Sequence, residues 1–127
     1  MILENVTLAR QIDIVFREIK EELALLTSGT VFVQIRNNVI GKFGVRAFPL
    51  ESKGNQLQKM GLGLSEEELQ TFRHTAMESL KLKRWTHGEI SFEFAMRQNK
   101  LCTSVAFESN YNMSSLMEEL NPNKKKD

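Results

Sequence analysis

The fold of this chain is decided by two stretches that share one pattern: residues 27–48 read TSGTVFVQIRNNVIGKFGVRAF, and residues 86–107 read THGEISFEFAMRQNKLCTSVAF. In each stretch a run of alternating apolar and polar residues leads to a polar pair, at residues 37–38 or 98–99, after which a second alternating run begins. Alternation with a period of two is typical of a half-buried strand, and a polar pair containing Asn is typical of a tight turn. Each stretch therefore predicts a β-hairpin.

The connection within each hairpin follows from which residues must share a face. In the first hairpin a two-residue turn would pair Val33 with Lys42 and place basic groups among the core aliphatic side chains. A three-residue connection, or an equivalent bulge, pairs Val33 with Phe43 instead. We expect one of these, with an Asn near the left-handed backbone region. The second hairpin needs no adjustment, because a two-residue turn at residues 98–99 already places apolar residues opposite each other.

A helix precedes each hairpin. The first has one apolar stripe with spacings of three and four, formed by Leu8, Ile12, Val15, Ile19, Leu23 and Leu26. Thr7 is a suitable N-cap, and residues 27–29 contain the Gly expected to end this helix. The second helix begins at a capping box of Ser65 and Glu68 and buries a stripe of Leu69, Phe72, Ala76 and Leu80. A short third helix from Asn112 to Leu120 offers apolar side chains for docking.

The apolar faces of these elements are buried most simply when both long helices cover the same face of one sheet. We therefore predict an α+β fold, a two-layer sandwich of the order α-β-β-α-β-β(-α) with an antiparallel sheet covered by helices on one face. A single domain spans residues 1–121, and its αββ units at 8–48 and 65–108 are either an internal repeat or two units that resemble each other by chance. Residues 49–63 are expected to form an exposed, mobile crossover, either functional or a plain connector, and residues 122–127 a disordered basic tail.

The composition is that of an ordinary globular protein and argues against several classes. The chain has 127 residues and a formal net charge of +1, which gives no global attraction to nucleic acid or to a membrane. The lone Cys102 excludes an intrachain disulfide, and neither a signal peptide nor an apolar run of membrane-spanning length is visible. We expect a cytoplasmic protein without membrane contact. The sequence contains no P-loop and no His and Cys at metal-ligand spacing, so no catalytic residue, metal or cofactor is predicted.

Helices on one side leave the other face of the sheet open, and the two halves of that face differ. The first hairpin contributes basic and large apolar side chains, and the second contributes small side chains bordered by glutamates. The predicted interface comprises Phe32, Gln34, Arg36, Ile40, Lys42, Arg46, Phe48, Glu93, Ala95, Arg97, Cys102, Ser104, Ala106 and Glu108. In a twofold dimer Phe32, Ile40 and Phe48 of one subunit would cover the small side chains of the other. We therefore expect a small non-catalytic protein-interaction or regulatory module that is homodimeric through this face.

Four alternatives remain open at this stage. The face is either an ordinary solvated surface or a docking surface for a different protein. Basic residues with Phe32 and Phe48 also resemble a stacking platform for single-stranded nucleic acid, although Glu89, Glu93 and Glu108 would repel a polyanion. The fourth alternative is a small enzyme, since catalytic groups can converge in space without a linear motif.

Overall fold

The computed structural model describes residues 6–47, 50–54, 56–59, 63–82 and 87–120. The elements in chain order are α1 (Leu8–Glu18), α2 (Lys20–Leu23), β1 (Ser28–Arg36), β2 (Val39–Arg46), β3 (Leu50–Lys53), β4 (Gln56–Lys59), α3 (Glu66–Ser79), the 3-10 helix η2 (Leu80–Leu82), β5 (His87–Arg97), β6 (Lys100–Ser109) and α4 (Met113–Leu120). The predicted tail at residues 122–127 lies outside the described residues.

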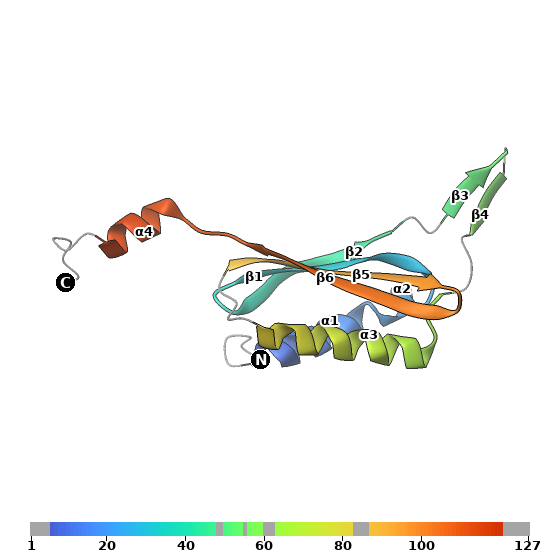
Figure 1. Ribbon diagram of the computed structural model, residues 1–127, viewed down its shortest axis with the longest axis horizontal. Coiled ribbons are helices and arrows are strands. Elements are labelled where there is room, and N and C mark those ends of the chain that lie inside the picture. The colour runs from blue at the N-terminus through green and yellow to red at the C-terminus, as the bar shows by residue number, and fades with distance from the viewer. Residues whose placement is uncertain (1–5, 48–49, 55, 60–62, 83–86, 121–127) are drawn as a thin grey trace.

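Four of the strands form one antiparallel sheet, in the order β2-β1-β5-β6. Figure 1 shows α1 and α3 side by side beneath one face of this sheet, with no described element over its other face. The two αββ units therefore meet at their first strands, β1 and β5, and leave their second strands as the outer edges. This arrangement confirms the predicted α+β fold with its helices on one side.

Local signals at the helix starts are confirmed. The Thr7 hydroxyl accepts a hydrogen bond from the Arg10 amide at 3.2 Å, which caps α1. At α3 the Ser65 hydroxyl accepts from the Glu68 amide at 3.2 Å, and the Glu68 carboxylate accepts from the Ser65 amide at 2.8 Å. Both hydrogen bonds of the capping box are therefore present. Each satisfies a backbone N–H that has no partner within the helix.

The core lies between the helix pair and the sheet, and aromatic rings connect its parts. Phe16 of α1 meets Phe72 of α3 edge to face, with ring centroids 5.2 Å apart. Phe16 also reaches Phe92 of β5 at 6.2 Å, and Phe72 reaches Phe94 at 5.0 Å. Such ring pairs add about 0.5–1.5 kcal/mol each beyond the area they bury. The cluster therefore fixes both helices to the same central strand.

The first hairpin combines a two-residue turn with a bulge. Val33 lies opposite Phe43, as predicted, but Ile35 lies opposite Ile40, so two residues of β2 face one residue of β1 between these pairs. The turn itself has both residues in the left-handed region, Asn37 at φ 52° and Asn38 at φ 63°. The bulge keeps the aliphatic pairs in register without lengthening the loop.

The bulge overturns one part of the open-face prediction. Ile40 was expected on the open face, but the extra residue turns its side chain to the helix side, where it is 5% exposed and belongs to the core. The side chain of Gln11 in α1 forms hydrogen bonds with the backbone at Ile40 and Asn38. Its side-chain oxygen accepts from the Ile40 amide at 2.7 Å, and its nitrogen donates to the Asn38 carbonyl at 3.1 Å.

The second hairpin has the predicted register. Met96 lies opposite Leu101 and Phe92 opposite Val105 across a two-residue turn. Gln98 and Asn99 both have positive φ, at 51° and 63°, which is the geometry that suits the twist of two antiparallel strands.

One other prediction is wrong. Ser28 and Gly29, expected among the residues that end the first helix, belong to a strand, because helical structure stops at Leu23 and β1 begins at Ser28. Gly29 serves close packing instead of a helix cap, since a Cβ there would lie 2.9 Å from the Arg46 carbonyl oxygen. The β3–β4 hairpin within the crossover at residues 49–63 was not predicted, and Gly54 at φ 65° lies between its strands. Figure 1 shows this hairpin extending beyond one end of the main sheet.

The last helix, α4, has the predicted position and lies apart from the main sheet. Figure 1 shows it at the end of an arm that continues β6 away from the sheet. Its apolar stripe is exposed, from Met113 at 67% through Leu116 and Met117 to Leu120 at 67%.

Candidate interaction surface

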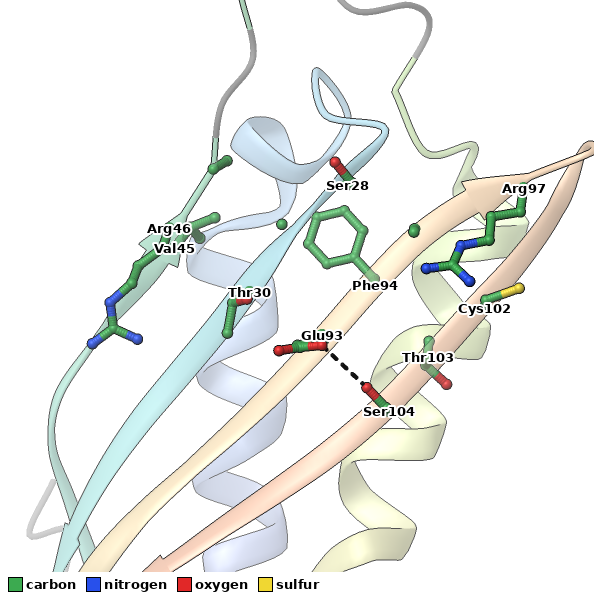
Figure 2. A pocket seen from close by; sticks show the side chains of 13 residues that line it. Ser28, Thr30, Val45, Arg46, Glu93, Phe94, Arg97, Cys102, Thr103 and Ser104 are labelled. Carbon is green, nitrogen blue, oxygen red and sulfur yellow. Dashed lines mark hydrogen bonds between the residues drawn. The ribbon is translucent and has the colours of Figure 1, made fainter.

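The open face of the sheet has a shallow hollow at the end where β1 begins. It has a volume of about 830 Å³ and is lined by residues of all four strands. Its open-face side chains are Ser28, Thr30, Arg46, Glu93, Ala95, Arg97, Cys102 and Ser104. Figure 2 shows Arg46 at one side of the hollow and Arg97 at the other, with Thr30 and Glu93 between them. The floor is flat because most of its side chains are small, and the two arginines stand at its sides.

On the β2 side, Arg46 lies over Phe32. Its guanidinium carbon is 4.0 Å from the ring centroid, a distance typical of a cation–π contact. The ring is 8% exposed and lies flat on the sheet because Gly44 opposite it has no side chain, and a Cβ there would lie 2.9 Å from the ring. Phe32 therefore supports Arg46 and does not project from the face.

The basic and acidic halves of the face are paired within one sheet. The Arg46 guanidinium lies 4.0 Å from the Glu89 carboxylate, and Gln34 donates a hydrogen bond to the same carboxylate oxygen at 3.3 Å. Arg46 is 58% exposed, so this ion pair contributes little to stability. Together with the contact to the Phe32 ring, it shows where the guanidinium lies at the side of the hollow.

On the β6 side, the hollow has polar groups and a thiol. Ser104 donates to the Glu93 carboxylate at 3.4 Å, as the dashed line in Figure 2 shows. Cys102 lies opposite Ala95, is exposed and has a free thiol. Arg97 is exposed, and among the described residues it forms no ion pair.

The hollow unites part of the predicted interface. Six of the predicted residues line it together: Arg46, Glu93, Ala95, Arg97, Cys102 and Ser104. Five are exposed outside it: Gln34, Arg36, Lys42, Ala106 and Glu108. Of the three large apolar side chains expected to project, Ile40 lies in the core, Phe32 is covered, and Phe48 lies outside the described residues.

The described open face lacks the projecting apolar side chains on which the dimer prediction depended. A face-to-face dimer was expected because large apolar groups would cover small ones, and the described part of the face provides no such projecting group. For the nucleic-acid alternative, Phe32 offers no free stacking surface, since Arg46 already covers its ring, and Phe48 lies outside the described residues. The described open face is therefore a polar surface with charges of both signs.

Two residues of the hollow were missed in the sequence. Ser28 and Thr30 lie opposite Ala95 and Glu93 on the central strand pair. The alternation of β1 continues back to Ser28, but residues 27–29 were interpreted as the end of a helix. The pairing of β1 with β5 has no signal in a single sequence, because it joins residues that are far apart in the chain.

A second, smaller hollow of about 220 Å³ lies between α1 and α3 and contains a buried carboxylate. Asp13 pairs with Arg10 at 2.7 Å, with Arg17 at 3.2 Å, and with Arg73 of α3. Burial raises the pKa of Asp13, but the hydrogen bond from Arg73 and the charges of Arg17, Arg73 and Arg10 outweigh it and hold that pKa below its usual value. We interpret this cluster as a structural connection between the helices.

Other chemistry is limited within the described residues. They contain no group of three His, Cys, Asp or Glu side chains that could hold a metal ion. His74 lies on the exposed side of α3, 3.7 Å from Glu78. His87 begins β5 opposite Arg36 and is also exposed. No helix among the described elements is both long enough and apolar enough to span a membrane.

Comparison of this chain with models of protein families, with curated protein sequences and with solved structures finds no match. The candidate site is therefore defined by geometry alone: a hollow on an uncovered sheet face, with one arginine at each side.

Proposed function

We propose that this protein is a cytoplasmic, non-catalytic protein-interaction module that binds a protein partner on the open face of its sheet. One observation supports this proposal above the others: the hollow of about 830 Å³ is formed by all four strands on a face that no described element covers. A rigid antiparallel sheet holds such a surface in one shape, so that a partner need not order it on binding.

The chemistry of the hollow favours a polar partner segment that carries a carboxylate. Arg97 forms no ion pair among the described residues, so its guanidinium can donate two parallel hydrogen bonds to a carboxylate of the partner. Glu93 and Ser104 supply polar groups farther along the same strand pair. The small side chains between them, such as Ala95, leave room for the backbone of an extended segment.

The test compares two arginines on the same face. Arg97 lies in the hollow, whereas Arg36 lies at the opposite end of β1, is exposed and does not line the hollow. The tagged full chain and its variants Arg97→Glu and Arg36→Glu are used to isolate binding proteins from cells that produce this protein. A candidate is then purified and its affinity measured by calorimetry. We expect Arg97→Glu to weaken binding by about a hundredfold and Arg36→Glu by less than about threefold.

If both variants lose affinity equally, or if neither variant loses affinity, the hollow is not part of the interface. A parallel titration with single-stranded oligonucleotides at low salt addresses the nucleic-acid alternative. Binding that falls steeply as salt is added would favour that alternative over a protein partner.

A further inference from the structure

The outer strand β6 is a regular sheet edge whose middle carries no charge. It pairs with β5 along its whole length from Lys100 to Ser109 and has no described strand on its other side. Its charged residues, Lys100 and Glu108, lie near its two ends, and the sequence LCTSVAF between them has no charge, no Pro and no Gly. Natural proteins protect exposed edges with bulges, charges or proline, because an unprotected edge pairs with another strand.

The opposite edge of the same sheet provides a direct comparison. The strand β2 is interrupted by the bulge between its Ile40 and Phe43 positions and has Lys42 in the middle of the strand. Both features discourage pairing with a further strand. The two edges were built from similar αββ units, and only β6 lacks this protection.

We infer that β6 is the dimer interface of this protein and pairs antiparallel with β6 of a second copy. The sequence of the strand is complementary to itself in one register. With Ser104 opposite Ser104 of the second copy, Lys100 of each copy lies opposite Glu108 of the other, which gives two attractive charge pairs across the twofold axis. The same register places Leu101 opposite Phe107, so apolar residues meet on the helix side.

Incompletely buried apolar residues on the helix side of β6 support pairing with a second copy. Leu101 and Val105 of β6 are only half-buried, and Phe107 is 40% exposed, although all three point to the face that the helices cover. A second copy joined at β6 would bring its own half-covered residues beside these, because a twofold axis normal to the sheet keeps both helix layers on one side. The pairing would thus complete a core that one copy leaves unfinished.

The dimer would also enlarge the open face. The same axis leaves both hollows facing the same direction on one continuous sheet of eight strands. This inference does not depend on the proposed function, since the dimer forms or fails to form without any partner protein.

The first test uses charge reversal with the full chain. Sedimentation equilibrium should show wild-type dimers at tens of micromolar. The variants Lys100→Glu and Glu108→Lys should each raise the dimer dissociation constant about tenfold, because each replaces two attractive pairs with two repulsive ones. The double variant should restore the wild-type constant to within about threefold. Lys42→Glu on the protected edge is the control and should leave it unchanged.

The second test fixes the register by oxidation. In a Cys102→Ser background, the substitution Ser104→Cys places two thiols directly opposite each other on the twofold axis, where a disulfide can form. We expect a covalent dimer from this variant, and none from the wild type, whose Cys102 lies opposite Ala106 of the second copy. A monomeric wild type, charge variants that dimerise as the wild type does, or no covalent dimer from the Ser104→Cys variant would each overturn the proposed pairing.

Discussion

Asp13 of α1 and Arg73 of α3, sixty residues apart in the chain, form an ion pair that joins the two helices of the layer beneath the sheet. Arg10 and Arg17 of the same α1 surface approach the other carboxylate oxygen, at 2.7 Å and 3.2 Å. The carboxylate is almost completely buried, whereas the three guanidinium groups are more exposed, so a single buried anion is surrounded by cations that keep their contact with water.

The first prediction concerns the stability that this ion pair supplies. Asp13→Asn should lower the free energy of unfolding by about 2 kcal/mol, because the ion pairs with three arginines are lost and the amide NH2 of Asn would face guanidinium donors. Chemical denaturation at neutral pH measures the change. Glu18→Gln, at an exposed position on the same helix, is the control and should change the free energy by less than about 0.5 kcal/mol. An equal effect from both variants would mean that net charge matters and the ion pair does not.

The same carboxylate predicts a pH dependence of stability. The pKa of Asp13 is lower in the folded protein than its usual value, because its arginine partners outweigh the effect of burial. A lowered folded-state pKa gives stability that is complete above the unfolded-state value and is lost as the pH falls through the folded-state value. The difference in unfolding free energy between the wild type and Asp13→Asn should therefore be constant from pH 7 to about pH 5 and shrink below about pH 4. A difference that does not change between pH 7 and pH 3 would contradict the assignment.

The third prediction concerns Gln11, whose side chain is buried beneath the first hairpin. Gln11→Leu keeps its size but removes both the acceptor for the Ile40 amide and the donor to the Asn38 carbonyl. The buried Ile40 amide and the part-buried Asn38 carbonyl would then lose this partner, and we expect the free energy of unfolding to fall by about 2–4 kcal/mol. Gln70→Leu, at an exposed position on α3, is the control for the change in side-chain chemistry. Hydrogen exchange should locate the loss, since the Ile40 amide would exchange much faster in the variant.

Much of the fold could be predicted from short-range patterns. The capping box of Ser65 and Glu68, the apolar stripe of the first helix and the register of the second hairpin all depend on residues close together in the chain. These signals are strong because each satisfies backbone groups or buries one face locally. The hypothesis of an internal repeat is consistent with the observed order of elements, and it stays a prediction.

The remaining features depend on contacts between distant residues. Ile40 is turned into the core by a bulge of a single residue, and a one-residue change of register reverses the face of a side chain. The hollow was predicted only in part, because Ser28 joins it through the pairing of β1 with β5. The repeated Phe-Arg dipeptides at residues 16–17 and 72–73 were visible in the sequence. Only the structure shows that their phenylalanines touch and their arginines share Asp13.

The fourth prediction concerns the turn of the second hairpin. Asn99 has φ of 63°, a conformation that Gly adopts without strain, and its Gln98 neighbour has the same sign. Asn99→Gly should therefore stabilise the protein by about 0.5 kcal/mol, while Asn99→Ala should destabilise it by about 1 kcal/mol. Thermal unfolding of both variants checks the sign. Two changes in the same direction would indicate that the Asn side chain, and not its backbone conformation, is what this turn requires.

The last prediction separates exposed apolar residues from those of the core. The stripe of α4 is as apolar as that of a buried helix, yet Leu116 is 44% and Met117 is 59% exposed. The double variant Leu116→Ser and Met117→Ser should change the free energy of unfolding by less than about 0.5 kcal/mol, because it removes no core contact. Leu64→Ala, at a position that is 4% exposed, should cost about 2–4 kcal/mol in the same assay. Measurement below micromolar concentration keeps association from contributing to the result. A loss in the α4 variant as large as that in Leu64→Ala would show that α4 packs against its own domain.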